Sequence, residues 1–119
     1  MASHNDLGKQ GEEMAVAFLK QKGYEIVEQN WKFQKAEIDI IAKKDAILVV
    51  VEVKTRSKLD FGLPQEFVKS RKIQLLLKAV NEYVILEDIE CDVRFDIIAI
   101  HKEEGCFNIE HYEDAFYYF

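Results

Sequence analysis

Two charged residues stand where the chain is otherwise apolar enough to form a buried strand. The segment from Ala46 to Thr55 consists mostly of branched aliphatic residues, a composition typical of a strand that is buried on both faces. Glu52 and Lys54 interrupt its end. Because desolvation of a charge is costly unless the group is paired or bound to a metal, this carboxylate and this ammonium group are the first candidates for chemistry.

The preceding segment supplies a second set of carboxylates. Residues 36–42 predict a strand and residues 43–45 a polar turn, so that the two strands form a hairpin. With Lys44 and Asp45 as a two-residue loop, Asp39 faces Val50 across the hairpin. In the same register Glu37 faces Glu52.

This register predicts a polar face on the hairpin, formed by Glu37, Asp39, Glu52 and Lys54. Asp39 and Glu52 then lie on a diagonal, about 7–8 Å apart at the backbone. Carboxylates that reach inward from this spacing can ligate one small hard cation, and Mg²⁺ commonly takes one or two carboxylates while it keeps several waters. Lys54 would point at whatever the metal holds.

Length and composition indicate one folded domain, residues 1–119. Its 49% hydrophobic and 32% charged residues are ordinary for a soluble globular protein. No run approaches the roughly 18 apolar residues of a membrane helix, and the first residues lack the pattern of a secretory signal. Cys91 and Cys106 fit no metal-ligand spacing and are expected to be reduced core thiols. We therefore expect a cytoplasmic protein without a membrane partner.

Charge is distributed unevenly along the chain. The net charge is −6, but the window from Lys54 to Lys78 holds seven basic and two acidic residues, or 7 − 2 = +5. A local basic patch can contact phosphates within an acidic protein. The candidate nucleic-acid contacts are Arg56, Lys58, Lys69, Arg71 and Lys72. On charge alone, a solvated helix face explains this window equally well.

The elements around the hairpin complete an α+β domain. The pattern predicts a helix from Asp6, as N-cap, to about Gln21, ended by Gly23 and with Glu12 at the edge of its apolar face. The other predicted elements are a strand at 24–33, a helix from Pro64 to about Leu86, and strands at 92–101 and 106–112. Their order is αβββαββ, with a mixed central β-sheet flanked by helices. The aromatic tail at 115–119 caps the core or joins a homodimer interface, and capping is the simpler interpretation.

Several motifs spread over nearly the whole chain carry a family resemblance. They are Gly8-x-x-Gly11-Glu12-x-x-Ala15, Gly23-Tyr24, Asn30, Glu37-Ile38-Asp39-Ile40-Ile41-Ala42, Val51-Glu52-Val53-Lys54-Thr55-Arg56, Phe61-Gly62-x-Pro64, Arg94-Phe95-Asp96 and the end from His111 to Phe116. In this combination the chain resembles the bacterial YraN-like predicted endonucleases. That family is similar to archaeal Holliday-junction resolvases within the PD-(D/E)xK nuclease superfamily. The chain departs from the usual pattern at Ala36, where glycine is common, and at Lys32, where arginine is common.

The resemblance implies a restriction-endonuclease-like fold and a role for each acidic residue. Asp39 and Glu52 would ligate Mg²⁺ (or Mn²⁺), Lys54 would be the catalytic lysine, and Glu12 would match the additional acidic residue of the resolvase site. The expected activity is hydrolysis of phosphodiester bonds in DNA rather than RNA, including branched or Holliday-junction DNA. Two other functions stay open: a nucleic-acid-binding module of nuclease fold that does not cut, and a protein-interaction adaptor favoured by the net charge of −6 and the aromatic tail.

Overall fold

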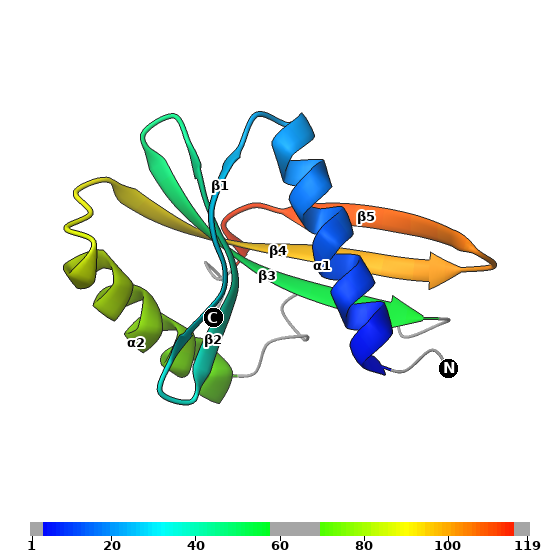
Figure 1. Ribbon diagram of the computed structural model, residues 1–119, viewed down its shortest axis with the longest axis horizontal. Helices are drawn as coiled ribbons and strands as arrows, with labels where there is room; N and C mark the ends of the chain where they lie inside the picture. The colour runs from blue at the N-terminus through cyan, green and yellow to red at the C-terminus, as the bar shows by residue number, and fades with distance from the viewer. Residues whose placement is uncertain (1–3, 58–69, 116–119) are drawn as a thin grey trace.

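The computed structural model describes residues 4–57 and 70–115 (Figure 1). Within these ranges two helices and five strands follow one another in the order αβββαββ. Their bounds are α1 His4–Gln21, β1 Glu25–Phe33, β2 Ala36–Lys44, β3 Ile47–Ser57, α2 Ser70–Leu86, β4 Asp92–Glu103 and β5 Cys106–Tyr112. Neither described helix is long and apolar enough to span a lipid bilayer.

The five strands form one mixed sheet in the order β1-β2-β3-β4-β5. Three neighbouring pairs are antiparallel, whereas β3 and β4 run parallel. Parallel neighbours need a long crossover connection, and α2 lies in the chain between these two strands. The predicted α+β class and the mixed sheet are confirmed.

One helix packs on each face of the sheet (Figure 1). Side chains of β3 alternate between the two cores, because Leu48 and Val50 lie in the cluster that contains α2, while Val49 and Val51 lie in the cluster that contains α1. The α2-side core includes Ile38, Ile41, Ile73, Leu76, Ala79, Val80, Tyr83 and Ile97. The α1-side core includes Ala15, Leu19, Tyr24, Ile40, Val53, Ile98 and Ile100. The prediction of a strand buried on both faces is therefore confirmed.

The predicted end of the first helix is confirmed in detail. Gly23 has a φ of 91°, a left-handed conformation that glycine adopts without steric cost. Its N–H donates to the Lys20 carbonyl at 3.0 Å, and the Tyr24 N–H donates to the Leu19 carbonyl at 3.0 Å. These two bonds form a Schellman motif, which turns the chain from α1 into β1.

The predicted register of the central hairpin is wrong. The turn consists of Asp45 and Ala46, and Lys44 pairs with Ile47 across it. Asp45 has a φ of 56°, a conformation that aspartate tolerates better than most residues. The pairing is displaced by two residues, so Asp39 does not face Val50. Because side chains alternate with a period of two, a shift of two leaves the paired residues 40–44 and 47–51 on their predicted faces.

Several predicted boundaries also differ from the structure. Helix α1 begins at His4, so Asp6 lies within the helix rather than at its N-cap. Strand β4 continues to Glu103, beyond the predicted end at His101. Cys106 is exposed at the start of β5, where the prediction of a core thiol is wrong, whereas Cys91 is half-buried.

Some predictions fall on residues outside the described part of the chain. Helix α2 is described from Ser70, so the predicted start at Pro64 lies outside it. The same is true of the aromatic residues 116–119.

Candidate functional site

Strands β2 and β3 stop pairing at the residue that carries the central carboxylate. The last pair of their ladder is Ile40 with Val51. Immediately beyond it, the backbone N–H of Val53 donates to Oδ2 of Asp39 at 2.8 Å. A carboxylate oxygen of β2 therefore takes the place of a backbone carbonyl as the acceptor for β3.

The alternation of side chains along β2 is broken at the same point. In a regular strand, residues two apart share a face, but Ile38 packs in the α2-side core and Ile40 packs in the α1-side core. Asp39 lies between these two residues.

Asp39 and Glu52 form a carboxyl pair at this separation. Glu52 is only 3% exposed, and its charge acts on the Asp39 carboxyl group. Burial and the charge of Glu52 raise the pKa of Asp39 to about 8, against the opposing effect of the Val53 N–H. At neutral pH Asp39 therefore keeps its proton, as expected for a desolvated carboxyl group beside a second carboxylate.

Helix α1 brings a third acidic group toward this pair. Glu12 is half-buried, and burial raises its pKa, a shift that the charges of Glu37 and Glu52 reinforce and a hydrogen bond with the Asn30 side chain opposes. The neighbouring Gly11 explains how the helix comes so near, because a Cβ atom there would collide with the Thr55 side chain on β3.

Lys54 adds a cation to the site. Its Nζ lies 3.8 Å from Oε2 of Glu52, and its side chain is 25% exposed. The ammonium group thus lies beside the buried carboxylate and still reaches solvent. Glu37, the third acidic residue of the predicted face, is exposed and forms a surface ion pair with Lys32 at 3.8 Å.

A cavity of about 360 Å³ opens beside Asp39. It lies where the first residues of β2 meet α2, and its lining is partly apolar. The lining residues are Lys35, Ala36, Glu37, Asp39, Leu75 and Leu76. The central carboxylate is therefore accessible to a ligand from the α2 side of the sheet.

The structure brings together the acidic residues and the lysine that the sequence singled out. Lys54 Nζ lies 3.8 Å from Glu52, the charge of Glu52 acts on Asp39, and the charge of Glu12 acts on both carboxyl groups. In the described part of the chain, no group of three or more His, Cys, Asp or Glu side chains is arranged to hold a metal ion. Mg²⁺ prefers hard oxygen ligands and usually takes only one or two carboxylates from a protein. Asp39 and Glu52 fit this requirement, and Glu12 lies at the periphery of the pair.

Most of the predicted basic contacts cannot be placed. Lys58 and Lys69 lie outside the described residues, and the side chains of Arg71 and Lys72 are also outside the description. Arg56 is half-buried on β3, two residues after Lys54. Asn30, which the sequence marked only as part of a family motif, lowers the pKa of Glu12, and residue spacing did not indicate this effect.

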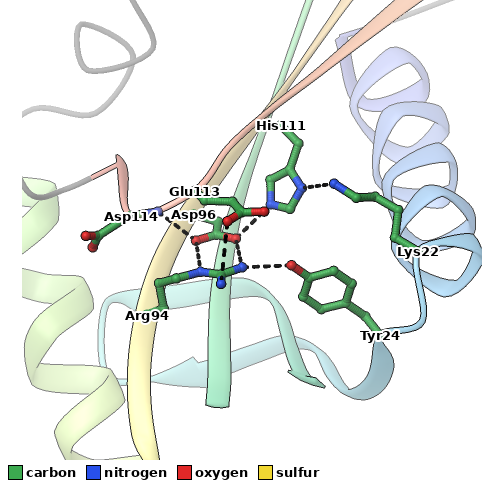
Figure 2. Close-up of polar contacts among 7 residues, drawn as sticks. All are labelled: Lys22, Tyr24, Arg94, Asp96, His111, Glu113 and Asp114. Carbon is green, nitrogen blue, oxygen red and sulfur yellow. Dashed lines mark hydrogen bonds and ion pairs between the residues drawn. The ribbon is translucent and has the colours of Figure 1, made fainter. Parts of the chain in front are cut away.

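A second polar cluster lies on the α1 side of the sheet (Figure 2). Asp96 is fully buried on β4 and accepts hydrogen bonds from Arg94 Nε at 2.9 Å, from an Arg94 terminal nitrogen at 2.8 Å and from the Asp114 N–H at 3.0 Å. His111 Nε2 lies 2.7 Å from the same carboxylate. Burial alone would raise the pKa of Asp96, but the bonds from His111, Arg94 and Asp114 hold it below its ordinary value.

This cluster connects the residues that follow α1 to strands β4 and β5. Lys22 Nζ lies 3.0 Å from His111 Nδ1, and Arg94 donates to the Tyr24 hydroxyl at 2.7 Å (Figure 2). Because a lysine ammonium group can only donate, Nδ1 accepts and the proton of the neutral ring is on Nε2, directed at Asp96. The cluster is a structural clamp rather than a part of the carboxylate site.

Comparison with known proteins supplies a family. The model of the uncharacterised protein family UPF0102 matches residues 11–100. A UPF0102 protein of Flavobacterium psychrophilum is 68% identical over 119 residues, covering 100% of both chains. UPF0102 proteins of Flavobacterium johnsoniae and Bacteroides thetaiotaomicron are 59% and 48% identical, the latter over 98% of this chain and 97% of its own. The matched region contains Glu12, Asp39, Glu52 and Lys54, and the chain belongs to the UPF0102 family.

Proposed function

We propose that this protein is a metal-dependent endonuclease of restriction-endonuclease-like fold that hydrolyses phosphodiester bonds in DNA. The observation that carries the proposal is the buried Glu52 carboxylate beside the half-buried Asp39, whose Oδ2 accepts from the Val53 N–H. Two carboxyl groups held together in low dielectric repel one another unless a proton or a cation neutralises them. A divalent cation would replace the proton on Asp39 and use both groups.

Asp39 and Glu52 would hold Mg²⁺ or Mn²⁺, with Glu12 directed at a metal-bound water or a second ligand position. When bound, the ion supplies a Lewis acid for the phosphate and lowers the pKa of a water molecule. The Val53 N–H fixes one oxygen of Asp39, which leaves its other oxygen to face a ligand. The hydrogen bond thus keeps the Asp39 carboxylate oriented before any substrate arrives.

Lys54 would contact the substrate rather than the ion. Its ammonium group is anchored beside Glu52 at 3.8 Å and is partly exposed, so it is placed to neutralise charge that develops on a phosphate oxygen. Nearby carboxylates favour the charged form of a lysine, which suits this role.

The cavity beside Asp39 supports a substrate that approaches from the α2 side. Its apolar wall at Leu75 and Leu76 and its exposed rim at Lys35 suit one nucleotide of a strand, with the sugar or base against the leucines. Branched DNA, including a four-way junction, exposes such nucleotides more readily than an intact duplex and is the proposed form of the substrate.

The proposal is tested with purified protein and labelled single-stranded, duplex, flap and four-way DNA in Mg²⁺, Mn²⁺ or EDTA. We expect cleavage in the presence of either metal, no cleavage in EDTA, and none by Asp39→Asn in any buffer. Binding to branched DNA without cleavage in metal would favour a non-catalytic nucleic-acid-binding module. A lack of binding to any of the four DNAs at low salt would favour a protein-interaction adaptor.

A further inference from the structure

Two polar contacts join the segment after α1 to strands β4 and β5. Lys22 Nζ lies 3.0 Å from Nδ1 of His111 on β5, and the Tyr24 hydroxyl accepts a hydrogen bond from Arg94 on β4 at 2.7 Å (Figure 2). The partners are 89 and 70 residues apart in the chain. Both contacts therefore hold the C-terminal end of α1 to a distant part of the sheet.

The two contacts differ in their dependence on pH. Histidine is the side chain whose charge ordinarily changes between pH 5 and pH 8, whereas arginine and tyrosine keep theirs in this range. Arg94 can therefore donate to Tyr24 throughout the range. Lys22 can donate to His111 only while Nδ1 carries no proton, because an ammonium group has no acceptor.

The surroundings of the His111 ring determine which nitrogen takes up a proton. In the neutral ring that accepts from Lys22, Nε2 carries the proton and directs it at Asp96, 2.7 Å away. The rings of Phe18 and Tyr24 pack edge-on against the imidazole, each with its centroid 6.0 Å away, and the His111 side chain is only 3% exposed. Acid can therefore protonate this ring only at Nδ1, which faces the Lys22 ammonium group.

Charged groups from several elements surround His111. They are Lys22 after α1, Arg94 and Asp96 on β4, and Glu113 and Asp114 after β5 (Figure 2). Asp96 also pairs with Arg94 at 2.8 Å. Protonation of the ring turns its hydrogen bond with Asp96 into a stronger, charge-assisted one. The same protonation places two cations against each other at Lys22, where both groups are donors.

We propose that His111 is a pH-sensitive latch, which binds Lys22 while the ring is neutral and releases it when Nδ1 is protonated. Lys22 Nζ also lies 5.0 Å from the centroid of the Phe18 ring, but Phe18 is part of α1, so that contact does not join the helix to β5. The bond between Arg94 and Tyr24 persists in acid. The latch thus loosens one of these two attachments, and it is independent of the proposed endonuclease activity.

A double-mutant cycle at two pH values tests the latch. Urea unfolding of the wild type, Lys22→Met, His111→Phe and the double variant, in EDTA at pH 8 and pH 5, gives the coupling between the two side chains. At pH 8 we expect the contact to raise the folding equilibrium constant about 2- to 10-fold, the range of one net hydrogen bond. At pH 5 we expect the coupling to vanish or to become unfavourable. No coupling at pH 8, or equal coupling at both pH values, would overturn the proposal.

Two control variants distinguish the latch from general effects of charge and pH. Lys20→Met removes an exposed lysine from the last turn of the same helix, and Tyr24→Phe removes the hydroxyl that accepts from Arg94. We expect each control to change stability by the same factor at pH 8 and at pH 5. If either control shows the pH dependence of Lys22→Met, the effect does not belong to the contact with His111 and the proposal is wrong.

Spectra of the wild type provide a test that does not require His111→Phe to fold. A ¹H–¹⁵N spectrum of the histidine rings at pH 8 should show a proton on Nε2 of His111 and none on Nδ1. Acid should protonate Nδ1 and move the side-chain signals of Lys22 over the same pH range, while those of Lys20 stay in place. A proton on Nδ1 at pH 8, a ring that stays neutral down to pH 5, or Lys22 signals that ignore the titration would each contradict the latch.

Discussion

Oδ2 of Asp39 accepts a hydrogen bond from the backbone N–H of Val53 at the point where β2 and β3 separate. The distance from the Val53 nitrogen to Oδ2 is 2.8 Å. The acceptor is a side-chain oxygen, where a regular strand pair would use a backbone carbonyl. This hydrogen bond holds the Asp39 carboxyl group beside β3, where the charge of Glu52, the residue before Val53, acts on it. Both acidic residues therefore lie on strands of the sheet and not on a loop.

The stability of the metal-free protein should fall as pH rises toward about 8. The pKa of Asp39 is raised to about 8 in the folded state, against about 3.9 in an unfolded chain. Its contribution to stability is therefore fully present below about pH 4 and is lost as the pH rises through about 8.

A bound cation should reverse this trend, because metal ligands must be deprotonated. We expect the rise in melting temperature caused by Mg²⁺ to be larger at pH 8 than at pH 6. Thermal melts in Mg²⁺ and in EDTA at these pH values measure the difference. If Mg²⁺ raises the melting temperature less at pH 8 than at pH 6, a metal site at Asp39 is contradicted.

Gly11→Ala should push α1 away from β3. A Cβ atom at position 11 meets the Thr55 side chain, whereas one at Gly8 on the same helix has no atom within 4 Å. Overpacking of this kind costs about 1–3 kcal/mol, while Gly8→Ala should be stabilising by up to about 1 kcal/mol. Urea unfolding of the two variants gives both values. Thr55→Ala should recover part of the loss in Gly11→Ala, and a loss that persists in full would place the collision elsewhere.

Asp96→Asn should destabilise the fold without any effect that depends on metal. Asp96 is fully buried, ion-paired with Arg94 and hydrogen-bonded to His111, and removal of one partner of a buried ion pair costs about 3 kcal/mol or more. The exposed Asp92 at the start of the same strand provides the control, because Asp92→Asn should stay within about 0.5 kcal/mol of the wild type. Denaturant unfolding at pH 7 in EDTA compares them.

The pH dependence of Asp96 has the opposite sign to that of Asp39. Its pKa is lowered in the folded state, so its contribution is present above the unfolded value of about 3.9 and is lost as pH falls through the folded value. The gap in stability between the wild type and Asp96→Asn should therefore narrow in acid. A gap that widens below pH 4 would refute this assignment.

Leu75→Trp should block the cavity beside Asp39. Leu75 lines the cavity, whereas Leu77 on the same helix is 47% exposed and outside the lining. An indole at position 75 should reduce cleavage of branched DNA by at least about 10-fold, which corresponds to about 1.4 kcal/mol in transition-state binding, and Leu77→Trp should leave it unchanged. Cleavage rates at saturating Mg²⁺ test this. Equal rates in both variants would show that the substrate does not enter the cavity.

The sequence predicted which faces of the central hairpin carry Asp39 and Glu52 better than it predicted which residues pair across the hairpin. Placement of the turn one residue too early moved Asp39 opposite Val50, but the displacement is even, so Asp39 and Glu52 stayed on compatible faces. The break in alternation at Asp39 and the positive φ of Asn30 were beyond prediction, because periodicity assumes a regular strand. The contact between Lys22 and His111 joins residues that are 89 positions apart, and no local pattern indicates it.

The most direct test of the metal site compares the wild type with Asp39→Asn by thermal unfolding in EDTA and in Mn²⁺. Asparagine keeps the shape and an oxygen acceptor for the Val53 N–H, but it removes the charge that repels Glu52. We therefore expect Asp39→Asn to melt in EDTA at the wild-type temperature or above it and to lose the stabilisation that Mn²⁺ gives the wild type. If Asp39→Asn instead melts well below the wild type in EDTA, and Mn²⁺ does not stabilise the wild type, Asp39 has an architectural role and the endonuclease proposal is wrong.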